Sequence, residues 1–374
     1  LLKSLYFYSV KIHQKYMRRC IQLAENGLGS TYPNPLVGSV LVYNDTIIGE
    51  GWHHQAGQAH AEVHAITNVQ TNANAAKIIA QGAMDSIQEL LSKTTIYVSL
   101  EPCSHVGRTP PCANLIIASG IKSVVVGSTD PNPKVAGKGL LKLKEAGCSI
   151  TLDVLEAECN ELNKRFFTFL NKKRPYVFLK WAQTKDGYIA PKSRKKRAPV
   201  WITNVFSRQQ VHQLRTKEQG IVVGTTTVLL DNPSLTARDW FGHNPTRIIL
   251  DRSLKIPNTS AIYNDKASTI IITEMPVEEI KNPTVIVEMI SFQKNLASQI
   301  CAIAYKHKLQ SIIIEGGSQT LQTFIDESIW DEALVYTGKV NFENGIKAPC
   351  IPQTTGIKKN IKNTHLSVYK NKTQ

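Results

Sequence analysis

Two short stretches in the first half of the chain carry residues that could bind a metal and move protons. HAEVHA places His60 two residues before Glu62, and PCSHVGRTPPC carries Cys103 and Cys112 further downstream. Catalytic zinc sites typically take three protein ligands and leave a fourth position for water. One imidazole and two thiolates form such a set, so His60, Cys103 and Cys112 are the predicted ligands. Glu62 would not bind the metal but would transfer protons during hydrolysis.

This zinc site requires helices that begin at particular residues. Side chains two apart on an α-helix point about 200° away from each other, so His60 and Glu62 can share a site only at a first helical turn. Cys112 follows Pro110 and Pro111, which favour the first turn of a helix. The positive end of that helix would stabilise a thiolate. We expect Cys103 in the loop after the strand TTIYVSL, so that two helix starts and one strand end meet at the metal.

Other interpretations of the same histidines fit less well. His60 and His64 share a helical face, but the zinc-protease pattern needs glutamate directly after the first histidine, where this chain has Ala61. A lone histidine would most simply be an ordinary core or surface residue. That interpretation does not account for H-x-E followed by P-C and a second cysteine. The zinc deaminase signature H-x-E…P-C-x-x-C matches, except that eight residues separate the cysteines instead of two. We therefore expect a deaminase and assign His64 to structure.

Strand-like and helix-like segments alternate along the chain, which predicts an α/β sandwich with a partly parallel sheet, followed by a second α/β domain. The polar stretch 68–93 is interpreted as a helical insertion. A domain boundary is expected between about Glu158 and Pro175, which gives domains 11–158 and 174–374. The predicted helices span 13–27, 61–69, 110–120, 139–147, 157–170, 207–217 and 318–328. The predicted strands span 37–51 (two, joined at Asn44-Asp45), 94–100, 123–128, 149–155, 176–182, 220–224, 246–250, 268–273 and 311–317.

The composition is that of a globular protein with acidic partners. The 374 residues favour two domains, and the hydrophobic and charged shares are 42% and 20%. A net charge of +15 suits nucleic acid or small phosphorylated molecules, although basic runs such as 192–197 are expected to be solvated loops. No apolar run is long enough to cross a bilayer, and the opening LLKSLYFYSV lacks a small-residue cleavage site. We expect a cytoplasmic protein.

Four motifs of the first half, TYPNPLVG, GEGWHHQAGQAHAEVHA, YVSLE and PCSHVGRTPPC, resemble the bifunctional riboflavin-biosynthesis deaminase–reductase family, which has the longer cysteine spacing. The resemblance implies a cytidine-deaminase-like α/β/α domain followed by a dihydrofolate-reductase-like α/β domain. The first domain, with one Zn2+ per chain, would hydrolyse the 2-amino group of a diaminopyrimidinone ribosylamino 5'-phosphate. The second would reduce the ribosyl side chain to ribityl with NADPH. Asn34, His53 and Arg108 would contact the substrate of the deaminase.

The second half is less informative by itself. It has no G-x-G-x-x-G after a strand, and SIIIEGGSQTLQTFI could hold a phosphate at a helix start or be a plain tight turn. The motifs KWAQTKDGYIA, WIT, LRTK, GTTTVLLDNPSLTAR, LDR and EGG resemble the reductase half of the family, although Thr184-Lys185 and Pro199 depart from its pattern. The implied substrate contacts are Lys180, Arg215, Leu235, Arg238 and Glu315. The implied NADPH contacts are Ala182, Trp201, Thr227, Asp231, Gly317, Ser318, Gln319, Thr320, Leu321, Gln322 and Thr323.

Two rival functions share parts of this pattern. A nucleic-acid base deaminase would use the same zinc chemistry and the same positive charge, but the long cysteine loop and the second α/β domain count against it. A zinc-stabilised scaffold would need no proton transfer at Glu62. We therefore expect a small phosphorylated pyrimidine as the partner, without nucleic acid or a membrane. Whether the chain forms a homo-oligomer stays open.

Overall fold

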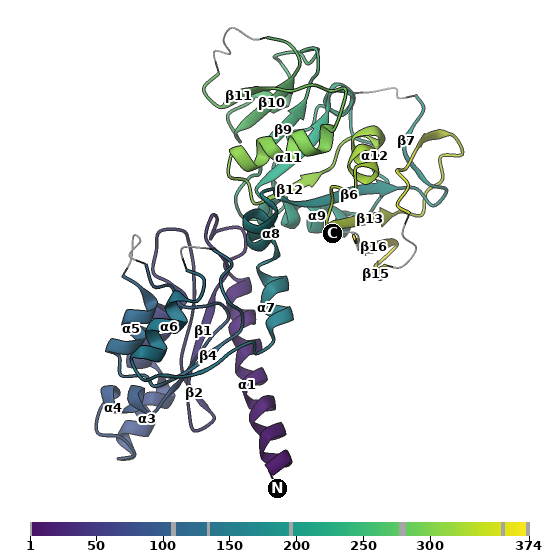
Figure 1. Cartoon of the computed structure of the whole chain (residues 1–374). Coiled ribbons are helices and arrows are strands. Elements are labelled where there is room, and N and C mark those ends of the chain that lie inside the picture. The colour runs from purple at the N-terminus through teal and green to yellow at the C-terminus, as the bar shows by residue number, and fades with distance from the viewer. Residues whose placement is uncertain are drawn as a thin grey trace. The chain divides into compact units, whose positions relative to one another are not determined.

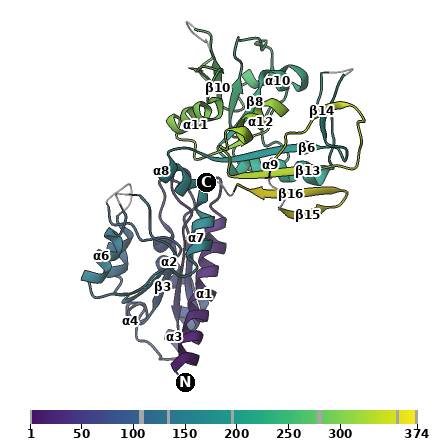
Figure 2. The ribbon, with the colours of Figure 1, turned by 45° about the vertical axis from the view of Figure 1, so that its right-hand side comes forward.

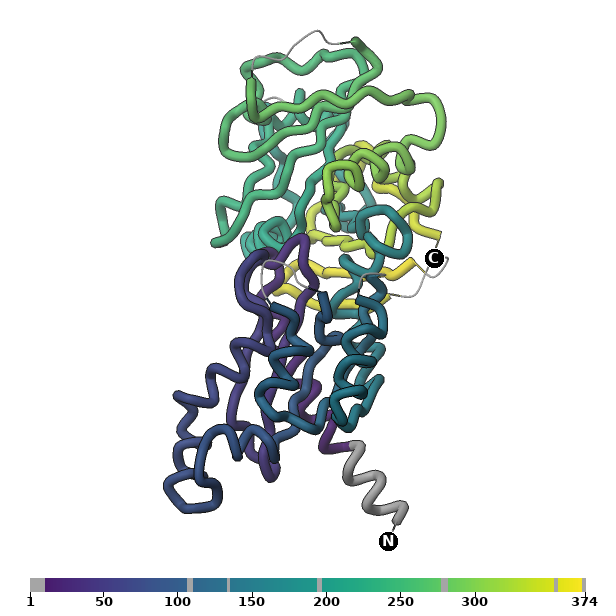
Figure 3. The backbone as a smooth tube through the Cα atoms, turned by 60° about the vertical axis from the view of Figure 1, so that its left-hand side comes forward, coloured from purple at the N-terminus to yellow at the C-terminus, as the bar shows by residue number. Residues whose placement is uncertain are grey.

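The computed structural model describes residues 2–105, 110–132, 135–193, 197–276, 282–352 and 356–371, without the side chains of residues 2–10. The chain divides into two compact units, Leu1–Lys172 and Lys173–Gln374. The path of the chain through each unit can be followed by colour in Figure 3. Among the described residues, no helix has both the length and the apolar character needed to cross a membrane.

The first unit contains a mixed sheet in the order β2-β1-β3-β4-β5. Strands β3, β4 and β5 run parallel, whereas β1 is antiparallel to both of its neighbours. The β1–β2 hairpin turns at Asn44 and Asp45, both with positive φ, a conformation that these residue types tolerate. The strands are β1 (Gly38–Tyr43), β2 (Thr46–Trp52), β3 (Thr95–Val98), β4 (Ser123–Val126) and β5 (Ser149–Thr151).

Helices cover both faces of this sheet because alternate strand residues are apolar on both sides. Leu41, Ile96 and Val124 pack with α2 to α6, whereas Val40 and Val125 pack with α1 and α7. Figure 1 shows α5 and α6 on the side of the sheet away from α1 and α7. The unit is therefore the predicted α/β/α sandwich. Its helices are α1 (Leu2–Glu25), α2 (Ala61–Asn68), α3 (Ala73–Ala80), α4 (Ile87–Ser92), α5 (Cys112–Ala118), α6 (Lys138–Glu145), α7 (Glu156–Leu162) and α8 (Lys164–Lys172).

The second unit contains a larger sheet in the order β11-β10-β9-β8-β12-β6-β13-β16-β15. The strands from β11 to β13 are parallel, and β16 and β15 add an antiparallel edge that Figure 2 shows beside β13. The strands are β6 (Tyr176–Gln183), β8 (Gly220–Gly224), β9 (Thr246–Leu250), β10 (Thr269–Thr273), β11 (Val285–Met289), β12 (Ser311–Ile314), β13 (Glu332–Thr337), β15 (Ile357–Ile361) and β16 (Thr364–Lys370). A separate pair joins β7 (Tyr188–Pro191) to β14 (Gly345–Lys347).

Two helices pack on each face of the larger sheet. Ile248, Ile270 and Ile312 form one core with α11 (Leu296–Lys306) and α12 (Ser318–Asp326). On the opposite face, α10 (Thr225–Asp231) packs on Ile221 and Ile249, and α9 (Val205–Lys217) packs near Phe178. The predicted second α/β domain is thus present, with the strands of its parallel part covered on both sides.

Several predicted elements differ from the structure in extent. The strand predicted for 149–155 is only Ser149–Thr151. The helix predicted for 157–170 is interrupted at Asn163, whose side-chain amide accepts a hydrogen bond from Leu36 N (2.8 Å) and donates one to Leu36 O (2.9 Å). Elements β7, β11 and β13 to β16 were not predicted, because their apolar alternation is short or weak. Helix α11 was not predicted either, and the segment of α10 was interpreted as part of a loop.

Candidate functional site

The predicted zinc ligands converge in the first unit. The Nδ1 atom of His60 lies 3.5 Å from the Sγ atom of Cys103 and 3.3 Å from the Sγ atom of Cys112. All three ligand atoms lie within 4.8 Å of one another. Tetrahedral zinc with ordinary Zn–N and Zn–S bond lengths places such nitrogen and sulfur atoms about 3.5 Å apart. The donor set and its spacing therefore fit a zinc ion.

Helix starts bring these ligands together, as the sequence predicts. His60 is the extended N-cap residue of α2, and Cys112 is the first residue of α5 after Pro111. Helix α2 can lie against β2 because Gly51 has no side chain: a Cβ there would be 2.5 Å from the Cβ of His64. The GEG sequence of β2 thus sets the position of His60.

The two thiols share one negative charge. The Sγ atom of Cys103 accepts a hydrogen bond from the backbone N–H of Cys112 (3.3 Å), at the N-terminus of α5. The interactions with the Cys112 side chain and with His60 outweigh burial and lower the pKa of Cys103. The same sharing raises the pKa of Cys112. This site is therefore arranged to hold a thiolate, the form that binds a metal.

Glu62 is buried in the first turn of α2, on the same side as the cluster. Its side chain is only 3% exposed. Burial, and then the negative charge of Cys103, raise the pKa of Glu62 to about 7. A carboxyl with a pKa in this range can both accept and donate a proton near neutral pH, which is what an acid–base group requires.

Asn34 and His53, two predicted substrate contacts, lie together beside the cluster. The Nδ1 atom of His53 donates to the carbonyl of Ala59 (3.0 Å), so its Nε2 accepts from the side-chain amide of Asn34 (3.0 Å). Burial lowers the pKa of His53 and keeps the ring neutral. Its ring meets that of His60 edge to face, with the centroids 5.3 Å apart. Asn34 is thereby oriented with its carbonyl oxygen free of the His53 contact.

Other parts of the predicted deaminase site differ in outcome. Arg108 lies outside the described residues. His64 is not among the clustered ligands and stacks on His54 at 4.2 Å between the ring centroids. Sequence reasoning missed Glu101, a buried carboxylate that accepts from Gly137 N (3.0 Å) and Gly139 N (3.1 Å) and so ties the chain just before Cys103 to the start of α6.

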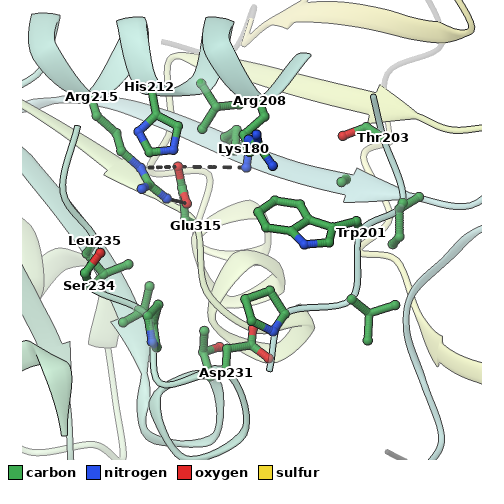
Figure 4. A pocket seen from close by; sticks show the side chains of 18 of the residues that line it. Lys180, Trp201, Thr203, Arg208, His212, Arg215, Asp231, Ser234, Leu235 and Glu315 are labelled. Carbon is green, nitrogen blue, oxygen red and sulfur yellow. Dashed lines mark hydrogen bonds and ion pairs between the residues drawn. The ribbon is translucent and has the colours of Figure 1, made fainter. Parts of the chain in front are cut away.

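A cavity of about 510 Å³ opens in the second unit. It is lined by residues from β6, α9, β8, α10 and β13, by Glu315 just after β12, and by nearby loops that include Pro199. Figure 4 shows Trp201 and Asp231 facing the same space as Glu315. Nine residues predicted from the family resemblance are among those that line it: Lys180, Ala182, Trp201, Arg215, Thr227, Asp231, Leu235, Arg238 and Glu315.

Glu315 joins two cations within this cavity. Arg215 donates to it from Nε (3.3 Å) and Nη2 (2.7 Å), and the Nζ atom of Lys180 lies 3.8 Å away. Burial alone would raise the pKa of Glu315, but the two positive charges hold that pKa at about 2. Burial lowers the pKa of Lys180. The group combines a fixed carboxylate with two cations, which suits an anionic ligand that has hydroxyl groups.

Helix α9 contributes two residues that sequence reasoning missed. His212 follows Arg208 by one turn, and both line the cavity together with Arg215. Burial, and then the charges of Arg215 and Arg238, lower the pKa of His212 to about 4, so its ring is neutral. Arg208 stacks on Trp201, with its guanidinium carbon 5.0 Å from the ring centroid, and pairs with Asp239 at 2.9 Å. Their spacing on one helical face was the available signal.

The run from Gly317 to Thr323 opens α12 beside this cavity. Gly317 has φ +59°, which explains a glycine at the N-cap. A Cβ on Gly224 would lie 3.2 Å from the Oγ1 atom of Thr320, so the helix start abuts the end of β8. Among the described residues that line the cavity, none belongs to this run.

The departures from the family pattern have local structural roles. Thr184 bonds the Asp186 carboxylate through its hydroxyl, which also accepts from Tyr188 N (2.9 Å), so it stabilises the turn between β6 and β7. Arg197, at the end of the basic run, donates to the carbonyl of Leu229 (2.8 Å) near the end of α10. Residues 194–196 of that run lie outside the described residues.

In comparisons with known proteins, two different families match the two parts of the chain that contain these sites. Residues 10–128 match the family of the cytidine and deoxycytidylate deaminase zinc-binding region, and residues 175–374 match the RibD C-terminal domain. The chain is 39% identical over 333 residues to the riboflavin biosynthesis protein RibD of Aquifex aeolicus, covering 87% of this chain and 86% of that protein. It is 36% identical over 353 residues to RibD of Bacillus amyloliquefaciens, covering 92% and 89%.

Solved structures give the same result. A diaminohydroxyphosphoribosylaminopyrimidine deaminase/5-amino-6-(5-phosphoribosylamino)uracil reductase from Thermotoga maritima has a TM-score of 0.82 and 34% identity, covering 97% of this chain and 99% of that one. RibD from Acinetobacter baumannii has a TM-score of 0.79 and 31% identity, covering 96% and 98%.

Proposed function

Because the chain belongs to the RibD family of riboflavin biosynthesis proteins, we propose that it acts on the compounds named for its Thermotoga maritima relative. It is a bifunctional enzyme, with a zinc-dependent deaminase followed by an NADPH-dependent reductase. We assign deamination to residues 11–158 and reduction to residues 174–374. The 2-amino group of the diaminopyrimidinone ribosylamino 5'-phosphate is removed first, and the ribosyl chain is then reduced to ribityl.

In the deaminase, water adds to C2 of the pyrimidine, the bond to the 2-amino nitrogen breaks, and ammonia leaves. Zinc, when bound by His60, Cys103 and Cys112, supplies a Lewis acid that activates water for this attack. Glu62 takes a proton from the water and passes it to the departing nitrogen. Its burial beside the three ligands and its raised pKa support that role.

Three residues are assigned to binding the pyrimidine of the first reaction. The Asn34 amide, held by His53, presents polar atoms that can read the edge of the ring. Arg108 is assigned to the substrate phosphate from the family resemblance alone. Neither Asn34 nor His53 carries a charge, so an uncharged pyrimidine ring can bind beside this pair without leaving a buried charge unpaired.

In the reductase, NADPH supplies the hydride and the protein positions the two reactants. Arg238 is exposed at the cavity and is assigned to the phosphate, together with Arg215 and Lys180. Glu315 and Asp231 orient the ribose hydroxyls, and Leu235 packs against the substrate. Ala182, Trp201, Thr227 and the run 317–323 are assigned to NADPH, with the start of α12 suited to a phosphate group.

One observation supports this function most strongly: residues inferred from two separate sets of motifs converge as two separate sites. The test first compares the ammonia released from the diaminopyrimidine phosphate with the ammonia released from cytosine or adenine in RNA. It then measures the oxidation of NADPH. Ammonia from the small molecule alone is expected. Failure to turn over the small molecule would refute the proposal, and turnover of RNA bases would favour the nucleic-acid deaminase.

The setting of the enzyme is also a proposal. We propose that it works in the cytoplasm on a free metabolite, without nucleic acid or a membrane. Cell fractionation would test the location. Light scattering would show whether it forms a homo-oligomer.

A further inference from the structure

Arg247 in β9 is a charged side chain with no exposed surface (0%). Its Nε atom donates to the carbonyl of Ser234 (3.0 Å), and its Nη1 donates to the carbonyls of Ile262 (2.8 Å) and Asn264 (3.0 Å). Its Nη2 donates to the side-chain oxygen of Asn264 (2.6 Å). Every acceptor in these contacts is neutral. The charge of Asp265 also acts on Arg247, but the effect of burial is larger and lowers the pKa of its guanidinium. Burying a charge whose direct hydrogen-bond partners are neutral is costly, so the arrangement needs a reason beyond filling space.

The loop that Arg247 holds contains a strained residue. Leu235 is buried and has φ +55°, a left-handed conformation that leucine adopts only where its surroundings impose it. Arg247 fixes the carbonyl on one side of it, at Ser234. Arg215 fixes the carbonyl on the other side, at Thr236, through Nη1 (3.0 Å). Two arginines therefore hold the carbonyl groups of Ser234 and Thr236, the two residues that flank Leu235.

This loop forms a wall of the reductase cavity. Figure 4 shows Ser234 and Leu235 beside Arg215 and Glu315. The hydroxyl of Ser234 lies 3.1 Å from that of Thr236 and accepts from Nη1 of Arg238 (3.3 Å). A shift of the Ser234 carbonyl would therefore move Leu235 and Arg238 together, and these are two of the assigned substrate contacts.

We infer that Arg247 is a positioning residue of the reductase: from outside the cavity lining it holds the Ser234–Leu235 loop in its left-handed conformation, and so sets the affinity for the phosphorylated pyrimidine. The inference rests on the proposed function of this cavity. Arg247 is not among the described residues that line the cavity, so its effect on the ligand passes through the backbone of Ser234.

The test compares Arg247→Lys and Arg247→Met with Asn264→Ala in the full chain. Lysine keeps the positive charge but lacks the several N–H donors of the planar guanidinium. Methionine keeps a long apolar side chain and removes the charge. Asn264→Ala removes an acceptor from the same guanidinium but leaves its bond to Ser234 intact. Each protein is given the deaminated intermediate and NADPH. Its deaminase activity and the thermal unfolding of the reductase unit report folding.

In the Arg247 variants, the KM for the pyrimidine is expected to rise about tenfold or more, because small displacements of binding groups are costly. The KM for NADPH and the deaminase rate should stay near the wild-type values, and Asn264→Ala should lower stability without changing the pyrimidine KM. An unchanged pyrimidine KM in a folded Arg247 variant would overturn the inference. So would an equal rise in Asn264→Ala, or loss of the reductase fold in both Arg247 variants. Wild-type protein that fails to oxidise NADPH would instead refute the proposed function.

Discussion

The deaminase and reductase sites are built in opposite ways. The reactive atoms of the deaminase site come from two helix starts and one loop, which belong to two short sequence motifs. The three metal-ligand atoms lie within 4.8 Å of one another. The reductase site spreads its residues over β6, α9, β8, α10, β13 and several loops around a cavity of about 510 Å³. Metal chemistry demands particular residue types at fixed distances, whereas positioning two large ligands demands a shaped surface. A set of metal ligands with fixed spacing can be recognised in a sequence, whereas the shape of a binding surface cannot.

Among the proposed variants, Glu62→Gln is expected to produce the largest difference between the two activities. Glutamine keeps the shape of the side chain but cannot transfer the proton, so deamination should fall by about 10²- to 10⁴-fold. Bound zinc should be retained, and NADPH oxidation with the deaminated intermediate should stay at the wild-type rate. Intact deamination in this variant would refute the acid–base role. Loss of both activities in a folded protein would show that the sites are not independent.

The reciprocal change is Glu315→Gln. It removes the carboxylate that joins Arg215 and Lys180. Reduction should fall by about 10²-fold because both cations lose the group that orients them. Ammonia release should be unchanged in the same preparation. Reduction within a fewfold of wild type would show that the ion cluster is structural.

A smaller effect is expected from Asn163→Ala. Asn163 contacts neither the metal ligands nor the cavity in the contacts described, but its amide makes both hydrogen bonds to the backbone of Leu36, close to Asn34. Losing them should cost about 1–3 kcal/mol of local stability. The KM of deamination should rise severalfold while kcat changes less. Asn160→Ala, in the last turn of α7, is the matched control: it removes the acceptor of a hydrogen bond from the Ser128 hydroxyl (2.6 Å) but leaves Leu36 untouched, and should leave the KM unchanged.

The pH dependence of stability should also distinguish the units. The folded-state pKa of Glu315, about 2, lies below its ordinary value of 4.5. A carboxyl with a depressed pKa stabilises the fold above the unfolded-state pKa and loses that contribution as pH falls towards the folded-state pKa. Each unit of difference corresponds to about 1.4 kcal/mol.

The stability advantage of wild type over Glu315→Gln should therefore be complete at neutral pH and should shrink between about pH 4.5 and pH 2. Denaturant unfolding of the reductase unit at pH 7, 4 and 3 measures it. A constant difference across this range would contradict the assigned ionisation.

The same contrast explains what the sequence could predict. The helix starts at His60 and Cys112 followed from side-chain directions and from two prolines, and the structure confirms both. The α/β sandwich with a partly parallel sheet followed from alternating segments, and its α/β/α layering from the family resemblance. The break at Asn163 and the contact of Glu101 with the start of α6 could not be predicted, because both depend on partners far away in the chain.

In the reductase half, the nine predicted cavity residues were assigned only through resemblance to a family. Arg247 shows why. In the sequence it is one basic residue in an apolar strand, and its importance lies in loop carbonyls that only the fold brings to it. The same holds for His212, whose neutral state follows from burial beside Arg215 and Arg238.

The central claim is that one chain carries two separate chemistries in sequence, and one measurement tests it most directly. Zinc content, ammonia release and NADPH oxidation are followed together on the diaminopyrimidine phosphate, with and without NADPH and after removal of the metal by a chelator. We predict one zinc per chain, ammonia release that needs zinc but not NADPH, and NADPH oxidation that follows it in equal amount. Ammonia release that survives complete loss of zinc, or NADPH oxidation without ammonia release, would contradict the account.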